Sequence, residues 1–141
     1  MSQSLEVSDY QALAEFRYQI RRFLSFSEAA AREAGIEPQQ HQLLLALKGM
    51  PTDRRPNIRA LAERLCVKHH TAIALVNHLV ARHLVRREPS SEDRREVLVV
   101  LTAGGETILR KLSALHRRQL KTVGAELVHA LQAIVERPNG A

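Results

Sequence analysis

The sequence predicts a mostly α-helical fold with one small β-hairpin, and three observations lead to this prediction. Apolar residues recur at three- and four-residue spacing near both ends of the chain, which is typical of helices with one buried face. Two short helical patterns occupy the middle, with an interruption at Cys66 and Val67. Two short apolar segments with a charged connection between them follow, as expected of a hairpin. The 141 residues suit a single domain.

The first long helix is expected over residues 10–34. Its apolar face contains Tyr10, Leu13, Phe16, Ile20, Phe23 and Ala30. Gly35 is a plausible left-handed cap at the end of this helix. Pro38 suits the first turn of a second helix, and Gly49 and Pro51 mark its end.

Two short helices follow, separated by a tight turn. Asn57 is a good N-cap for the first of them, whose apolar positions are Ile58, Leu61, Ala62 and Leu65. The apolar period resumes in the second at Ala72, Leu75, Val76 and Leu79. The pair is therefore predicted to be a helix-turn-helix.

The hairpin strands are predicted at residues 85–88 and 96–101, the second being rich in β-branched residues. The connection between them is polar and charged. Thr102 can cap a last helical region over residues 103–137. We expect Gly124 to break or bend this region, giving one long and one short helix. This order of elements predicts a winged helix-turn-helix between terminal helices.

Composition excludes several classes of protein. Apolar residues make up 45% and charged residues 26%, which indicates a globular chain. A single cysteine excludes an internal disulfide framework. No apolar run is long enough to span a membrane, and the polar, acidic segment 1–9 does not resemble a signal peptide. We therefore expect a cytoplasmic protein without a membrane partner.

The positive charge points to double-stranded DNA as a partner, because basic residues outnumber acidic ones around the helix-turn-helix and the hairpin. The second helix of such a pair enters the major groove. The candidate contacts near its start are Lys68, His69, His70 and Thr71, and those one to two turns later are Asn77 and His78.

The hairpin adds further candidate contacts. Arg94 and Arg95 at its tip can enter the electronegative minor groove, and Arg86 lies on the first strand. The carboxylate of Asp93 can orient an arginine, with Arg86 or Arg87 across the hairpin as its partner.

Five segments of the chain resemble one known family. They are Ala60–Leu65, Leu75–Leu79, Leu84–Arg87, Asp93–Arg95 and Leu101–Thr102. In these residues, and most specifically in the hairpin, the chain resembles the MarR family of winged helix-turn-helix regulators. Cys66 stands where that family usually has glycine, and Ala74 stands where a polar residue is frequent.

The resemblance implies one MarR-like domain over residues 1–141. Residues 10–34 and 103–137 would form dimerisation helices, and residues 38–101 would form the DNA-binding lobe. The apolar stripes of the terminal helices independently favour a homodimer, since a small central unit cannot bury them. The resemblance also implies repression at a near-palindromic operator and release by a small aromatic effector, with Arg94 in the minor groove.

Three alternatives remain open from the sequence. Cys66 with His69 or His70 could make the protein a metal- or thiol-responsive regulator, although no complete ligand set with structural spacing is present. The protein could instead be a winged-helix protein-interaction module that no longer recognises DNA. No catalytic motif is present, so neither an enzyme nor a bound cofactor or metal is expected.

Overall fold

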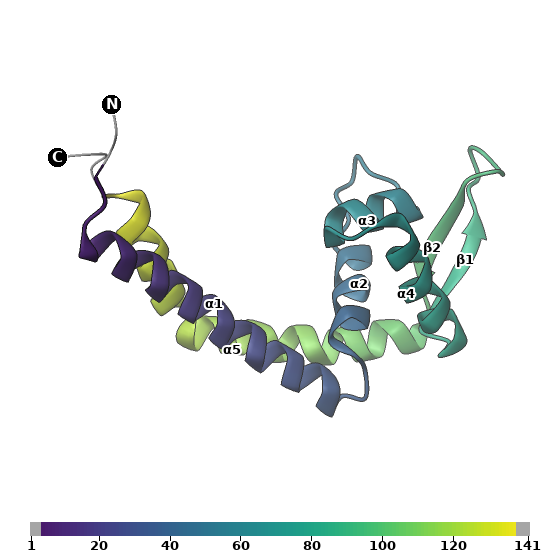
Figure 1. Cartoon of the computed structure of the whole chain (residues 1–141). Coiled ribbons are helices and arrows are strands. Elements are labelled where there is room, and N and C mark those ends of the chain that lie inside the picture. The colour runs from purple at the N-terminus through teal and green to yellow at the C-terminus, as the bar shows by residue number, and fades with distance from the viewer. Residues whose placement is uncertain (1–3, 138–141) are drawn as a thin grey trace. The chain divides into compact units, whose positions relative to one another are not determined.

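The computed structural model describes residues 4–137, so both ends of the predicted domain lie outside the described residues. The chain is mostly helical with one antiparallel hairpin, as predicted (Figure 1). The elements in chain order are α1 (Val7–Glu33), α2 (Pro38–Lys48), α3 (Ile58–Leu65), α4 (His69–Ala81), β1 (Val85–Pro89), β2 (Val97–Leu101) and α5 (Ala103–Val135). Within residues 4–137, no helix is long and apolar enough to cross a membrane.

The chain divides into two compact units. The central unit covers residues 31–113 and contains α2, α3, α4, the hairpin and the start of α5. The terminal unit combines residues up to 30 with residues from 114 onward, so it contains most of α1 and the rest of α5.

The core of the central unit is aliphatic. Helices α2, α3 and α4 each bury one face, and the hairpin contributes one residue from each strand. The fully buried side chains of this core include Ile36, Leu43, Leu44, Leu61, Val76, Leu79, Val85, Val99 and Leu112. The four buried positions in α4 are those that the helical period predicted. In α3, the predicted Leu61 and Ala62 are buried together with Ala60, whereas the predicted Ile58 and Leu65 are only partly buried.

The turn between α3 and α4 forms for local reasons. The Asn57 side chain accepts a hydrogen bond from the backbone N–H of Ala60 at 2.8 Å and so caps α3, as predicted. At the other end, Cys66 adopts a left-handed backbone with φ of 56°. The N–H groups of Cys66 and Val67 donate to the carbonyls of Glu63 and Ala62, which ends α3. Lys68 is then the N-cap of α4.

The hairpin is held against the loop before α3. Its register pairs Val85 with Leu101 and Pro89 with Val97. The backbone N–H of Val99 donates to the carbonyl of Pro56 at 2.9 Å, and Asn57 forms an isolated bridge with Leu98. The hairpin is therefore extended by a short third backbone segment that sequence periodicity did not reveal.

The start of α5 packs closely on the residues before β1. Thr102 caps α5 as predicted, because its Oγ1 accepts from the N–H of Gly105 at 3.1 Å, and it also donates to the carbonyl of His83 at 2.7 Å. A Cβ on Gly105 would lie 2.1 Å from the carbonyl oxygen of Leu84. Only glycine fits at this position.

The predicted break at Gly124 is wrong, because α5 continues from Ala103 to Val135. A glycine inside a helix costs only about 1 kcal/mol relative to alanine. The helical neighbours on both sides outweigh that cost. A Cβ at this position would meet only Leu120, at 3.9 Å, so nothing in the described chain requires glycine there.

In the terminal unit, α1 and α5 run antiparallel. Arg22 pairs with Glu126 at 2.8 Å, and Asp9 pairs with Arg137 at 2.7 Å. The imidazole of His116 lies 2.7 Å from the Ser27 hydroxyl and meets two phenylalanine rings, Phe23 and Phe26, edge-on. The predicted apolar stripe of α1 is only partly covered, since Tyr10 and Leu13 remain about half exposed.

Candidate nucleic-acid interface

Helix α4 presents a solvent-facing surface at the edge of the central unit. It buries Ala72, Leu75, Val76 and Leu79, and the opposite face is exposed. Lys68, His69 and His70 are exposed at its start, and Thr71 is partly buried. The four sequence-predicted residues therefore lie together at the N-terminal end of one helix.

Asn77 and His78 are exposed further along α4. The Asn77 side-chain oxygen accepts a hydrogen bond from the Arg87 guanidinium of β1. This contact joins the outward face of α4 to the hairpin. It leaves the Asn77 NH₂ group available to acceptors outside the chain.

Two apolar residues on the exposed side of α4, Ile73 and Ala74, were not among the contacts predicted from the sequence. Ile73 is 36% exposed, and Ala74 is also exposed. The available signal was spacing, since Ile73 lies three residues after His70 and four before Asn77. Such positions share one face of a helix.

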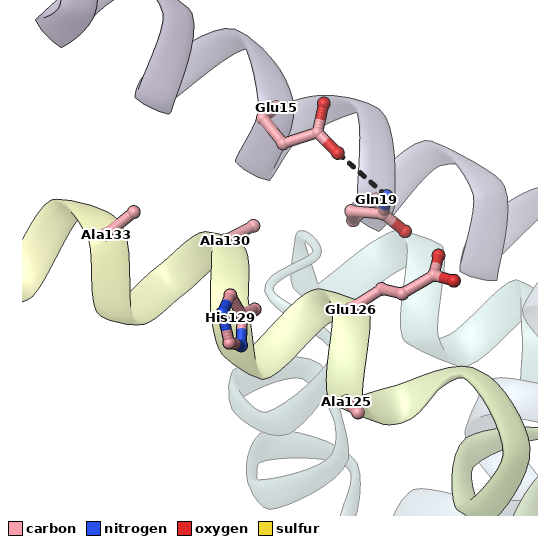
Figure 2. A pocket seen from close by; sticks show the side chains of 7 residues that line it. All are labelled: Glu15, Gln19, Ala125, Glu126, His129, Ala130 and Ala133. Atoms are coloured by element: carbon pink, nitrogen blue, oxygen red, sulfur yellow. Dashed lines mark hydrogen bonds between the residues drawn. The ribbon is translucent and has the colours of Figure 1, made fainter.

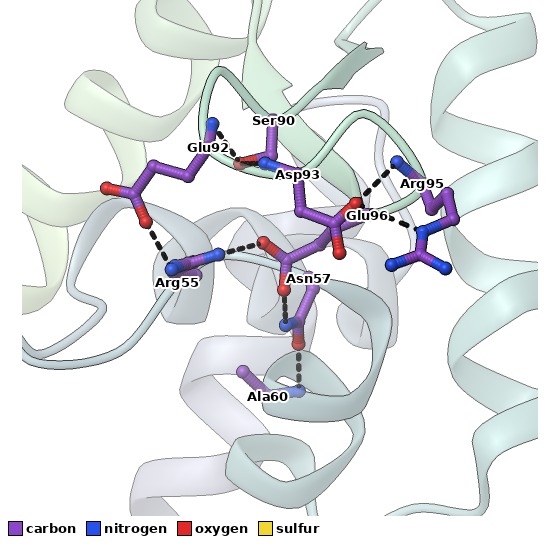
Figure 3. Close-up of polar contacts among 8 residues, drawn as sticks. All are labelled: Arg55, Asn57, Ala60, Ser90, Glu92, Asp93, Arg95 and Glu96. Atoms are coloured by element: carbon purple, nitrogen blue, oxygen red, sulfur yellow. Dashed lines mark hydrogen bonds and ion pairs between the residues drawn. The ribbon is translucent and has the colours of Figure 1, made fainter.

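The hairpin tip is ordered by its own polar residues (Figure 3). Ser90 is buried, and its hydroxyl accepts from the backbone N–H groups of Glu92 and Asp93. The Asp93 carboxylate in turn accepts from the backbone N–H of Arg95 at 3.0 Å and from its guanidinium at 3.4 Å.

The predicted partner of Asp93 was therefore wrong: the carboxylate holds Arg95, two residues away, rather than Arg86 or Arg87. Arg86 pairs with Glu88 on its own strand at 2.7 Å, and Arg87 donates to Asn77. The reason is local geometry, because the turn after Ser90 directs Asp93 back toward its own segment.

A second set of contacts connects the hairpin to the loop before α3 (Figure 3). The Arg55 guanidinium contacts the carboxylates of both Glu92 and Glu96, the latter at 2.7 Å. Asn57 donates from its side chain to Glu96 at 2.9 Å. Hydrogen bonds from Arg55 and then Asn57 lower the pKa of Glu96, and the hydrogen bond to Glu96 raises the pKa of Arg55.

These contacts decide which cations are available to an anionic partner. Arg54, Arg55, Arg86 and Arg95 each have a carboxylate partner. Over residues 4–137, neither Lys68 nor Arg94 has a side-chain hydrogen bond or ion pair. Arg95 remains accessible, since its side chain is 92% exposed. The surface therefore presents uncompensated charge at the start of α4 and at the hairpin tip.

Cys66, His69 and His70, on which the metal alternative depends, do not form a metal site in the described chain. Cys66 is exposed. In the part of the chain that the structure describes, no three His, Cys, Asp or Glu side chains form a group that could hold a metal ion.

A separate cavity of about 500 Å³ lies in the terminal unit between α1 and α5 (Figure 2). It is lined by Glu15, Gln19, Ala125, Glu126, His129, Ala130 and Ala133. Gln19 donates to Glu15 at 2.9 Å. Of the two carboxylates in this lining, that of Glu126 is paired with Arg22.

Residues 34–96 match the model of the MarR family. They include α2, α3, α4, β1 and the hairpin tip, so the candidate interface falls inside the matched region. No curated protein matches the chain.

The fold is similar to that of solved MarR regulators. AbsC, a MarR family transcriptional regulator from Streptomyces coelicolor, shares 20% identity over 96% of this chain and 94% of its own, with a TM-score of 0.76. RV1404 from Mycobacterium tuberculosis shares 24% identity over 98% and 100%, with a TM-score of 0.72. The M. tuberculosis transcriptional regulator MOSR, solved in complex with DNA, shares 24% identity over 77% of each chain, with a TM-score of 0.58.

Proposed function

We propose that the protein is a homodimeric transcription regulator that represses genes by binding a near-palindromic operator in duplex DNA. One observation carries the proposal. Within a MarR-type lobe, the exposed face of α4 and the hairpin tip carry Lys68 and Arg94, which have no ion-pair partner in the described chain. The similar fold of MOSR, solved with DNA, supports the same function. Such a protein acts in the cytoplasm.

In this proposal α4 enters the major groove. Lys68 contacts phosphate or guanine, and His69, His70 and Thr71 offer hydrogen-bonding groups to base edges or phosphate. Asn77 and His78, one to two turns later, contact the backbone. The N–H groups at the start of α4 add a favourable electrostatic contribution toward phosphate.

The hairpin acts as a wing against the minor groove. Arg94 at its tip enters the groove, where the negative potential is strongest in narrow A·T tracts. Asp93 limits the side-chain freedom of Arg95, so less conformational entropy is lost when Arg95 contacts a phosphate. Arg86 lies on β1 at the base of the wing. It contacts a phosphate in place of Glu88, its ion-pair partner in the free chain.

A second copy of the chain covers the apolar surface of the terminal unit. Ten large apolar residues there are 40% or more exposed: Leu5, Val7, Tyr10, Leu13, Tyr18, Leu24, Leu120, Val128, Leu131 and Val135. Burying one such side chain completely contributes about 1.5–3 kcal/mol. Covering even half of this set in each copy gives a substantial driving force for a two-fold dimer.

The cavity between α1 and α5 fits the same proposal. Three of its lining residues are alanines, which leave room for side chains of the second copy. In this proposal a small aromatic effector releases the operator. Release then follows if the effector favours a dimer whose α4 helices no longer match successive major grooves, about 34–36 Å apart.

Selection of bound sequences from a random duplex pool, combined with light scattering of the complex, tests the proposal. The expected result is one enriched, near-palindromic sequence bound by two chains. Arg94→Ala should weaken binding, whereas Arg117→Ala, which removes an exposed cation of the terminal unit, should have little effect. A monomer that enriches no sequence at low salt would refute the proposal.

A further inference from the structure

The exposed surface of α4 includes two adjacent apolar residues, Ile73 and Ala74, among polar ones. With about 100° between successive residues of a helix, His70, Ala74 and Asn77 lie close to the line opposite the buried face, and Ile73 and His78 flank them on either side. His69 lies beyond Ile73, at the edge of the surface. An α-helix in the major groove would present its central residues most directly to base edges.

Ile73 is not part of the buried core of the central unit. The core side of α4 is complete with Leu75, Val76 and Leu79, and Ile73 remains 36% exposed. Neither Ile73 nor Ala74 can donate or accept a side-chain hydrogen bond. An isoleucine therefore suits a partner that offers an apolar group at the centre of a polar surface.

The major groove has one such group, the C5-methyl of thymine. We propose that Ile73, with Ala74 beside it, contacts this methyl group and specifies a T·A pair within each operator half-site. This inference rests on the proposed DNA-binding function and adds a specificity-determining residue to it. The polar neighbours His70 and Asn77 would contact the bases or backbone on either side.

The Arg87–Asn77 hydrogen bond supports this arrangement. One lone pair of the Asn77 side-chain oxygen is occupied by a guanidinium, so Asn77 is not fully available for the paired hydrogen bonds by which asparagine reads adenine. Asn77, one turn after Ile73, is therefore less able to recognise a base through hydrogen bonds. The apolar contact of Ile73 becomes correspondingly more important for the sequence preference.

Replacing thymine with uracil tests the inference, because it removes only the C5-methyl. Burying one methyl-sized group changes a dissociation constant by about fourfold. For the wild type on its selected duplex, uracil at the contacted position should weaken binding about fourfold in one half-site and about fifteenfold in both. Replacement of thymine by uracil elsewhere in the duplex should leave the dissociation constant unchanged.

The variant Ile73→Ala should lose this sensitivity, with less than a twofold change between the thymine and uracil duplexes. Leu45→Ala is the matched control, because it shortens an exposed aliphatic residue of α2 rather than α4, and it should keep the wild-type sensitivity. Ile73→Val retains a branched side chain and should keep most of the sensitivity of binding to uracil. Circular dichroism and the thermal midpoint verify that each variant is folded.

The outcomes separate the inference from the proposed function. Specific binding that ignores every thymine-to-uracil replacement would overturn the inference and leave the regulator assignment intact. Equal sensitivity of Ile73→Ala and the wild type would assign the methyl contact to another residue and overturn the role of Ile73. Absence of any duplex binding would overturn both.

Discussion

The close approach between the start of α5 and the residues before β1 gives a sharp prediction about stability. Gly105→Ala would place a Cβ 2.1 Å from the carbonyl oxygen of Leu84 and 3.1 Å from a Leu101 side-chain carbon. Atoms in contact are normally at least 3 Å apart, so backbone would have to move by about 1 Å. The obstructing atom belongs to the main chain and cannot rotate away as a side chain would.

The expected cost follows from packing. Insertion of an extra methyl group into a filled space typically costs about 1–3 kcal/mol, and the gain in helix propensity from alanine offsets at most about 1 kcal/mol. Because the clash involves the main chain, we expect a packing cost near the upper end of this range. The free energy of unfolding of Gly105→Ala should therefore fall by about 1–2 kcal/mol. For a chain of this size, that loss lowers the midpoint of thermal unfolding by roughly 2–8 °C.

Gly104→Ala is the matched control in the same turn. Its Cβ would meet its nearest neighbours at 3.7 Å, which is ordinary contact, so stability should be unchanged or up to about 1 kcal/mol higher. Calorimetry or urea unfolding measures both variants. If Gly105→Ala were as stable as Gly104→Ala, the close approach of α5 to Leu84 would be contradicted.

Three further predictions concern the turn and the base of the wing. Cys66→Gly should raise the free energy of unfolding by about 0.5–1 kcal/mol relative to Cys66→Ala in urea titrations, because only glycine adopts φ of 56° without strain; equal stability would contradict the strain. Asn57→Ala should lower it by about 1–2 kcal/mol, because it removes the α3 cap and the hydrogen bond to Glu96, and Asn57→Ser, which keeps an acceptor for the cap, should lower it by less. The pKa of Glu96 lies below its ordinary value of 4.5. The ionised Glu96 therefore contributes to the free energy of unfolding above pH 4.5, and this contribution is lost as the pH falls through the lowered pKa. Arg55→Ala should raise the pKa of Glu96 measured by carbon NMR, and an unchanged pKa would refute the assigned cause.

The parts of the fold that depend on neighbouring residues could be predicted from the sequence. Asn57 and Thr102 cap their helices because a short polar side chain can reach the N–H groups one turn ahead. Gly35 adopts the predicted left-handed conformation with φ of 83°. Caps of this kind depend on a few consecutive residues, and those are visible in the sequence.

Features that depend on distant residues were not predictable in the same way. Arg55 and Glu96 are 41 positions apart, and only the docking of the hairpin on the loop before α3 brings them together. Gly105 is required by the carbonyl of Leu84, a main-chain atom about twenty residues earlier. Its sequence signal, a glycine just after a helix cap, is also compatible with simple turn chemistry.

Two errors show the limits of single-residue signals. Gly124 was expected to break α5, but its cost is small compared with the many hydrogen bonds of a long helix. Asp93 was paired with an arginine across the hairpin, whereas the tip directs it to Arg95 on the same segment. Ile73 was not predicted as a contact because an exposed apolar residue carries no polar signal, although it lies on the exposed side of α4.

The dependence of DNA binding on salt tests the central claim most directly. For the selected duplex, the logarithm of the association constant should fall linearly with the logarithm of the salt concentration, with a slope of about −0.9 per phosphate neutralised. Arg94→Ala removes one cation from each of two wings, so it should reduce the steepness by about 1.8. An unchanged slope in Arg94→Ala would contradict the placement of the wing against DNA.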